Sequence, residues 1–217
     1  RNIGRHKQSV SESSFYAWNK FYKQDASAIN TIVSYYNKGA VVAMCLDLYL
    51  RQASEGQMSL NNVMNILWRE YGKPGKPTHP EVISDIITKQ LDLPLPDFYQ
   101  SAVYGTDELP VETLLEHVGV TVARRTRING KDKGGKAAEN ASTRQFGAMY
   151  SSQPTGVKIT QVSDASPAMQ AGLQVNDILL CIDQWQVSEQ DLQQRLDKLP
   201  EQDQVQLHVL RDKRLFQ

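Results

Sequence analysis

The sequence predicts an α+β protein in two parts, an all-helical bundle over residues 1–119 and a small β-sandwich or barrel with two helices over residues 143–217. Apolar residues recur every three or four positions before residue 119, as expected of amphipathic helices that pack on one another. After residue 143 they gather in short runs rich in valine and isoleucine, which are typical of strands. Residues 120–142 combine a predicted strand, Val120–Arg127, with a lysine- and glycine-rich loop, Lys131–Asn140, so the domain boundary is expected there.

The first helices are predicted from aromatic and aliphatic spacing. Phe15, Trp18 and Phe21 repeat every three residues after a serine-rich stretch suited to capping, and they predict a short helix that ends near Asp25. A longer helix is predicted over residues 28–51. Its buried face would comprise Ile32, Val33, Tyr36, Ala40, Val41, Met44, Cys45 and Leu48.

Four more helices are predicted before residue 119. One begins at Ser59, whose side chain suits an N-cap, and stops at Gly72. Another carries Pro80 in its first turn, and two shorter helices cover residues 98–104 and 110–117.

The second part alternates strands and helices. A strand is predicted at Gly156–Val162, followed by a helix that Ser166 caps and Gly172 closes. A strand near residues 178–183, a helix over residues 189–198 and a strand over residues 205–212 complete the order.

Composition excludes several functions. Lys plus Arg and Asp plus Glu both number 24, so no positive field favours nucleic acid as a partner. No apolar run approaches the roughly 18 residues of a membrane span. The two cysteines, Cys45 and Cys181, lie in apolar stretches and are interpreted as buried thiols. We expect a soluble protein, and the bacterial cytoplasm and periplasm both remain open as its compartment.

Three short motifs after residue 143 resemble the PDZ domains of bacterial proteases. They are Phe146-Gly147-Ala148-Met149, Ser166-Pro167-Ala168-Met169-Gln170-Ala171-Gly172-Leu173 and Asn176-Asp177-Ile178, with Arg211-Asp212 near the end. The sequence departs from that pattern at Asn176 and Lys213, where a polar residue often tolerates an unusual backbone.

This resemblance implies strand addition, in which a peptide or protein C-terminus pairs with an exposed edge strand while loop N–H groups hold its carboxylate. Phe146, Gly147, Ala148 and Met149 would form the loop and edge strand. Gly147 would let the N–H groups converge on an anion. Leu192 would line the groove, or it belongs to the core.

Four segments of the helical part resemble, in order, elements of the glycyl aminopeptidase family, whose members end in a PDZ domain. They are Gln8–Val10, Ser13–Trp18, Tyr35–Gly39 and Gly105–Pro110. The resemblance implies that the helices are the C-terminal part of a thermolysin-like catalytic domain. In that family a His-Glu-x-x-His helix and a downstream Glu hold zinc.

No metal site is expected in this chain. Its four histidines are His6, His79, His117 and His208, and no two have the four-residue spacing that points two imidazoles at one metal. Zinc is therefore expected only in a full-length parent, held by an upstream domain. The chain opens with Arg1 rather than Met, so we expect a fragment or a processed product.

Tyr36 is the candidate catalytic residue. It matches the Tyr of a Tyr-x-Lys-Gly element in related zinc aminopeptidases, where the phenol donates a hydrogen bond to the oxyanion of the tetrahedral intermediate. The alternative is a half-buried helix aromatic. Tyr35 should point elsewhere and serve as a control, and Lys38 is interpreted as a solvated helix lysine.

Two functions compete. The chain is either the C-terminal part of a zinc aminopeptidase, inactive alone, or a non-catalytic PDZ-containing scaffold that binds peptides. A stand-alone hydrolase is disfavoured, because no glycine-flanked serine or reactive cysteine setting is present.

Overall fold

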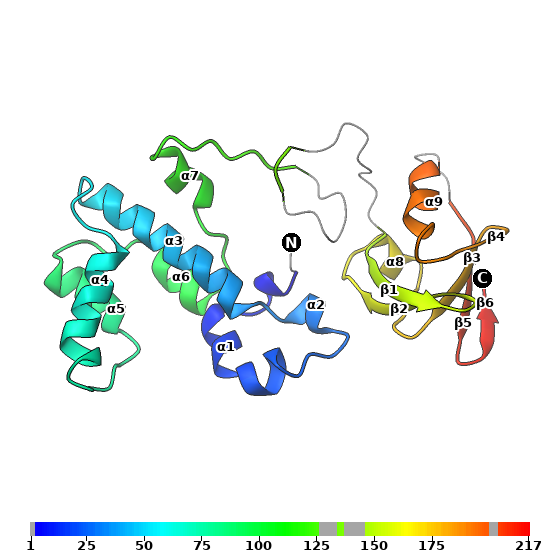
Figure 1. Cartoon of the computed structure of the whole chain (residues 1–217), viewed down its shortest axis with the longest axis horizontal. Coiled ribbons are helices and arrows are strands. Elements are labelled where there is room, and N and C mark those ends of the chain that lie inside the picture. Colours follow the sequence, from blue (N-terminus) through cyan, green and yellow to red (C-terminus); the bar gives the residue numbers. More distant parts are fainter. Residues whose placement is uncertain (1–2, 126–133, 137–145, 200–203) are drawn as a thin grey trace. The chain divides into compact units, whose positions relative to one another are not determined.

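The computed structural model (Figure 1) describes residues 3–125, 134–136, 146–199 and 204–217. These residues form two compact units. The helical unit comprises Gly4–Lys23 and Ile32–Ala123, and the sheet unit comprises Ile3, Gln24–Thr31 and the described residues from Arg124 onward. Helices come first and a sheet follows, so the predicted α+β class is confirmed. Within the described ranges, no helix is both long and apolar enough to cross a membrane.

Every regular element described before residue 120 is helical. In chain order the elements are η1 (Ile3–His6), α1 (Val10–Phe15), η2 (Ala17–Phe21), α2 (Ala28–Thr31), α3 (Tyr35–Ala53), α4 (Leu60–Leu67), η3 (Trp68–Gly72), α5 (Val82–Asp85), η4 (Ile86–Gln90), α6 (Phe98–Tyr104) and α7 (Val111–Glu116). The helix predicted to open at Ser59 is present, since the Ser59 N–H donates to the side-chain oxygen of Asn62 at 2.9 Å.

The single helix predicted over residues 28–51 is wrong, because the structure divides it into α2 and α3. Ser34 has extended backbone angles, φ −73° and ψ 110°, and its hydroxyl accepts a hydrogen bond from the Asn37 N–H at 3.2 Å. This N-cap satisfies a donor that a new helix start would otherwise leave unpaired. Tyr35 and Tyr36 therefore occupy the first turn of α3 rather than the middle of a longer helix.

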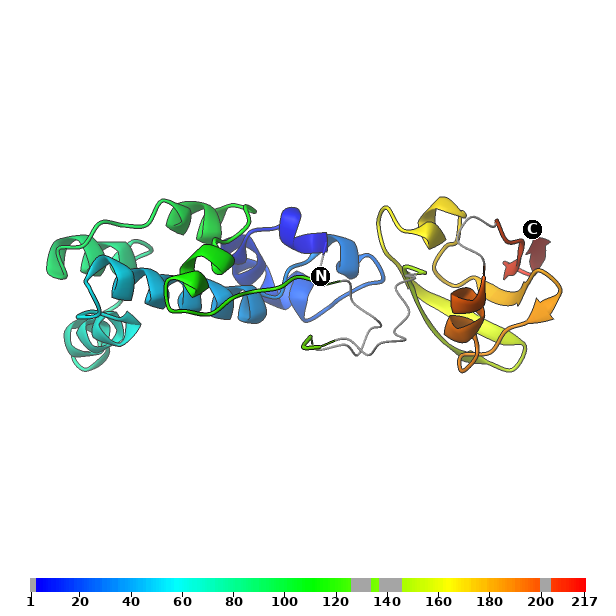
Figure 2. The same ribbon diagram turned by 90° about the horizontal axis from the view of Figure 1, so that it is seen from above.

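The predicted buried face of that helix is also partly wrong. Cys45 is buried as expected, but Tyr36 and Met44 are 59% and 38% exposed. The face that α3 buries instead includes Val42, Leu46 and Leu50. This face lies at the centre of the helical unit, where α3 contacts α1, α4, α6 and α7 (Figures 1 and 2).

One hydrophobic core holds the outer helices of this unit together. Its fully buried members come from α3, α4, α5, η4 and α6. They are Leu46, Leu50, Val63, Val82, Ile86, Ile87 and Tyr99.

Besides α2, the described residues of the sheet unit contain one antiparallel sheet and two more short helices. The strands are β1 (Ala148–Gln153), β2 (Gly156–Val162), β3 (Ile178–Ile182), β4 (Trp185–Gln186), β5 (Leu207–Arg211) and β6 (Arg214–Phe216), and the helices are α8 (Pro167–Gln170) and α9 (Leu192–Lys198). The sheet order is β1-β2-β3-β5-β6, with β4 paired to β3. The predicted strand Val120–Arg127 is absent over its described residues 120–125, where Val120 and Val122 are exposed. Its remaining residues, Thr126 and Arg127, lie outside the described ranges.

A buried ion pair joins two of the sequence motifs. Asp177 is 1% exposed, and Arg211 donates to its two carboxylate oxygens at 2.7 Å each, 34 residues further along the chain. The same guanidinium donates to the Gly172 carbonyl at 2.7 Å, and the bonds to Asp177 raise the pKa of Arg211. This bidentate pair, with Asp177 buried and the Arg211 side chain 26% exposed, fixes β5 against the turn before β3.

Both sequence departures from the PDZ pattern fall where the backbone is left-handed. Asn176 has φ +77° and Lys213 has φ +65°, values that favour glycine and cost other residues free energy. The expectation of an unusual backbone at both positions is confirmed.

Segment Gln24–Thr31 belongs to the sheet unit through Asn30. The Asn30 amide donates to the Val162 carbonyl at 2.8 Å, and its oxygen accepts from the Asp164 N–H at 2.9 Å. Asn30 is only 8% exposed, so both bonds are shielded from water. They hold the turn that links β2 to α8.

Candidate functional site

Tyr36 lies in an aromatic cluster on the surface of the helical unit. Tyr35 and Tyr36 begin α3, with ring centroids 4.2 Å apart, and Tyr22 follows η2. The Phe21 ring lies 5.1 Å from that of Tyr35 and 5.4 Å from that of Tyr22, so ring contacts hold the cluster together. Tyr36 and Tyr22 nevertheless remain 59% and 50% exposed. Their hydroxyls are therefore accessible from outside this unit.

The three tyrosine hydroxyls converge. The Tyr22 hydroxyl oxygen lies 2.8 Å from that of Tyr36 and 3.0 Å from that of Tyr35. Hydrogen bonds from Tyr22 first, and then from Tyr35, lower the pKa of the Tyr36 phenol. Hydrogen bonds with Tyr22 first, and then with Tyr36, raise the pKa of the Tyr35 phenol. Tyr35 thus does not point elsewhere, and the expectation that it would serve as an independent control is wrong.

Lys38 is not the solvated lysine that the sequence suggested. Its ammonium is shielded from solvent, and within the described part of the chain it has no hydrogen-bond partner. Burial lowers the pKa of Lys38, while the nearby Glu108 carboxylate acts in the opposite direction. Glu108 itself is bound by Arg5, whose Nη2 lies 2.6 Å from the carboxylate oxygen.

The helical unit offers no metal centre over its described residues. Three or more His, Cys, Asp or Glu side chains do not gather anywhere in the described ranges, and the four histidines are scattered through the sequence. The donor set that zinc requires therefore does not fit the residues present. That this chain carries no metal site stays a prediction.

The Gly147 loop is fixed by close packing. Gly147 has φ +81°, and a Cβ built there would lie 2.1 Å from the Ser166 Cβ, so only glycine fits. The Phe146 and Gly147 carbonyls accept from the N–H groups of Ala168 and Ser163, at 3.0 and 2.8 Å. Among the described residues, the Gly147 N–H has no hydrogen-bond acceptor. The loop therefore presents a donor while its acceptors are already satisfied.

Strand β1 forms an edge of the sheet. It pairs with β2 on one side, and no described strand pairs with its other side. Met149 on this strand is 56% exposed. Burial raises the pKa of the Tyr150 phenol, and the Glu189 and Asp197 carboxylates raise it further, so β1 faces the α9 region. The geometry is the one that strand addition requires.

The remaining predicted site residues are less open. Phe146 and Ala148 are partly buried against the core of the sheet unit, and Leu192 is completely buried within it. Leu192, the first residue of α9, therefore belongs to the hydrophobic core on which this helix packs. A direct contact from Leu192 to a bound peptide stays a prediction.

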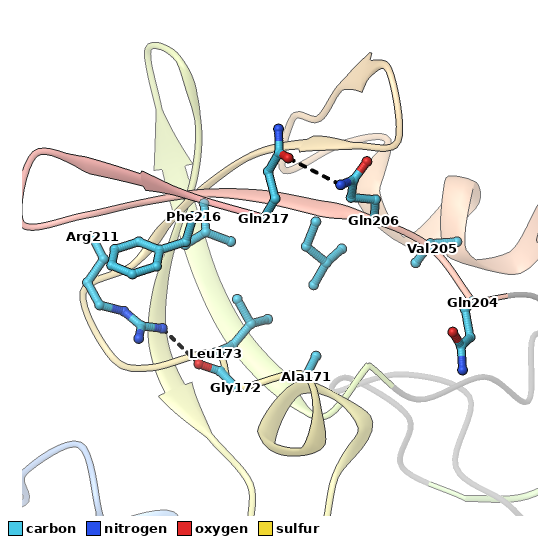
Figure 3. Close-up of a pocket in the computed structure, with 11 residues that line it drawn as sticks. Ala171, Gly172, Leu173, Gln204, Val205, Gln206, Arg211, Phe216 and Gln217 are labelled. Carbon is cyan, nitrogen blue, oxygen red and sulfur yellow. Dashed lines mark hydrogen bonds between the residues drawn. The ribbon is translucent and has the colours of Figure 1, made fainter.

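A cavity that the sequence did not indicate lies elsewhere in the sheet unit. It measures about 590 Å³ and lies between the end of α8 and the β5–β6 hairpin (Figure 3). Leu173, Val205 and Phe216 line it, and Arg211 bonds Gly172 at its edge. None of the five predicted peptide-site residues lines this cavity. No motif signalled it, because its walls come from segments distant in sequence.

The helical unit thus presents a surface tyrosine cluster, and the sheet unit has the open edge of a PDZ-type domain. Two family models match parts of the chain. Residues 1–42 match the family model described as M61 glycyl aminopeptidase, and residues 118–217 match the PDZ domain model. Among curated proteins no sequence matches.

One solved structure is similar over nearly the whole chain. It is the crystal structure of an aminopeptidase N family protein from Idiomarina loihiensis, with 36% identity and a TM-score of 0.90. The match covers 99% of this chain and 37% of that chain, so this chain spans little more than a third of its length. The chain therefore carries a segment that matches the M61 glycyl aminopeptidase family at residues 1–42 and a PDZ domain at residues 118–217.

Proposed function

We propose that this chain supplies a transition-state donor and a peptide-binding domain to a zinc aminopeptidase whose metal ligands lie outside it. The helical unit would be part of a thermolysin-like catalytic domain, completed by an upstream zinc-binding domain. The carrying observation is the accessible Tyr36 hydroxyl, which lies inside the stretch that matches the M61 family. Alone, the chain is expected to be inactive.

Tyr36 would act by hydrogen bonding. As a peptide carbonyl becomes tetrahedral, negative charge develops on its oxygen, and a phenol O–H aimed at that oxygen stabilises the charge. The bond is stronger in the transition state than in the ground state, so it raises kcat. Such a donor contributes about 3 kcal/mol, or on the order of a hundredfold in rate.

The test is Tyr36→Phe in a protein that carries the zinc domain ahead of this sequence. We expect kcat to fall about a hundredfold with KM little changed. Tyr49→Phe is the matched control, since Tyr49 lies on the same helix and donates to the Pro94 carbonyl at 3.2 Å, away from the cluster. If both variants keep full activity, Tyr36 has no catalytic role and the non-catalytic scaffold becomes the better description.

The sheet unit would bind a peptide C-terminus along β1. Its support is that, among the described residues, no strand pairs with the outer edge of β1 and no acceptor bonds the neighbouring Gly147 N–H. We expect hydrophobic C-terminal peptides to bind at micromolar Kd, about 8 kcal/mol, and to lose that affinity when their C-terminus is amidated. Calorimetry on this chain measures both. Equal binding of acid and amide forms, or no binding across a diverse library, would remove this role.

A further inference from the structure

The polarity of the tyrosine cluster decides whether Tyr36 has a proton to donate. A phenol donates one hydrogen bond and accepts others. If Tyr36 donated to Tyr22, its proton would be committed and unable to reach an oxyanion. If Tyr22 donates to Tyr36, across the 2.8 Å between their oxygens, the Tyr36 proton stays free.

The surroundings favour the second arrangement. Tyr22 is central, with its oxygen within 3.0 Å of both other hydroxyls, so it can accept from Tyr35 and donate to Tyr36. The pKa directions are consistent with this polarity, since hydrogen bonds within the cluster raise the pKa of Tyr35 and lower that of Tyr36. Lys20, which pairs with Glu12 at 3.5 Å, has its ammonium over the Tyr16 ring. The pKa shift of Tyr36 has no charged contributor.

We propose that Tyr22 is a positioning residue for Tyr36: Tyr35 donates to Tyr22, Tyr22 donates to Tyr36, and the Tyr36 proton is left to point at the substrate oxyanion. This inference rests on the proposed function for its catalytic consequence. Serial hydrogen bonds polarise one another, so the chain also strengthens Tyr36 as a donor. The packing of the Tyr22 ring on Trp18, with centroids 5.2 Å apart, holds the middle hydroxyl in place.

The first test needs only this chain. In protein labelled with ¹³Cζ-tyrosine, each phenol titrates as a separate NMR signal, assigned through Tyr→Phe variants. Tyr22→Phe keeps the ring packing and removes the hydroxyl, so the Tyr36 midpoint should rise toward the ordinary value of 10.0 and the Tyr35 midpoint should fall toward it. Tyr49→Phe should move neither. Unchanged midpoints in Tyr22→Phe would overturn the relay.

The second test measures turnover in the longer, zinc-carrying protein. Tyr22→Phe should lower kcat about tenfold with KM unchanged, as expected for the loss of one positioning hydrogen bond. The double variant with Tyr36→Phe should be no slower than Tyr36→Phe alone, because Tyr22 acts only through Tyr36. If kcat of the double variant fell by the product of the two single losses, the inference would be contradicted. If Tyr36→Phe itself is silent, the proposed function fails, while the titration still reports on the relay.

Discussion

Tyr36 lies on the exposed surface of the helical unit, held by two hydroxyls and a few aromatic rings, whereas Gly147 lies in a loop that the sheet unit fixes on its own. The peptide loop has its carbonyls bonded, its backbone angle set and a core directly beneath it. The tyrosine cluster presents an exposed phenol, and no group of three metal-binding side chains is found among the described residues. We infer that strand addition can be studied in this chain alone, whereas the proposed role of Tyr36 is tested in the longer, zinc-carrying protein.

Among these changes, we expect removal of the Asp177–Arg211 ion pair to lower the stability of the sheet unit most. Asp177→Ala removes two charged hydrogen bonds from Arg211, whose side chain is 26% exposed, so we expect a loss of about 2–3 kcal/mol in unfolding free energy. Hydrogen exchange followed by mass spectrometry should show protection lost over β2 and β3 but kept over α3. Equal loss in α3 would mean that the two units unfold together, and the contrast between them would be wrong.

Gly147→Ala tests whether packing defines the peptide loop. The new Cβ would collide with Ser166, so we expect a loss of about 2 kcal/mol in unfolding free energy and weaker peptide binding. Gly172→Ala is the matched control, because Gly172 has a similar φ of +77° with nothing within 4 Å of an added Cβ. If the two variants lose the same free energy, backbone strain alone explains the effect and the contact with Ser166 has no importance.

Asn30→Ala asks whether Gln24–Thr31 belongs energetically to the sheet unit. The change removes the part-buried hydrogen bonds of Asn30 with the Asp164 N–H and the Val162 carbonyl, at a cost of about 1–2 kcal/mol. Exchange at the Asp164 amide should accelerate accordingly, and the exposed Asn65→Ala in α4 should leave it unchanged. If the exchange rate of the Asp164 amide is unchanged in Asn30→Ala, Gln24–Thr31 does not stabilise the sheet unit and its assignment to that unit is wrong.

Lys213→Gly should give the smallest change, and it should be a gain. Lys213 adopts φ +65°, so glycine removes strain and we expect about 1 kcal/mol of added stability in chemical denaturation. Lys158→Gly in β2 is the control, and it should lower the stability, since glycine weakens a strand interior. A loss of stability on Lys213→Gly would show that its side chain has a role beyond the turn.

Much of the sheet unit follows from local signals. The Ser166 cap, the Asn176 turn and the strand Gly156–Val162 were all predictable, because capping, left-handed backbone and β-branched runs act over a few residues. The three-residue strand β6 was missed, since it exists only by pairing with β5. The break before α3 was missed although Ser34 is a good N-cap, because the apolar spacing on both sides was read as continuous.

The candidate catalytic site was predictable only in part. Tyr36 was found through a short family element, but Tyr22 carries no motif and lies 14 residues away. Its role appears only when η2 and α3 fold together and bring the hydroxyls to hydrogen-bonding distance. The cavity beside Phe216 could not be predicted from the sequence for the same reason. Sites assembled from distant segments are properties of tertiary structure.

The Asp177–Arg211 pair also bears on the order in which the sheet unit can form during synthesis. The carboxylate is made 34 residues before its guanidinium, so β3 leaves the ribosome with an acidic group that has no counter-charge. Burying that group early would be strongly unfavourable. The domain should therefore stay open at this edge until β5 arrives, and a chain cut just before Arg211 should remain a target for chaperones and proteases rather than a slightly weakened native fold.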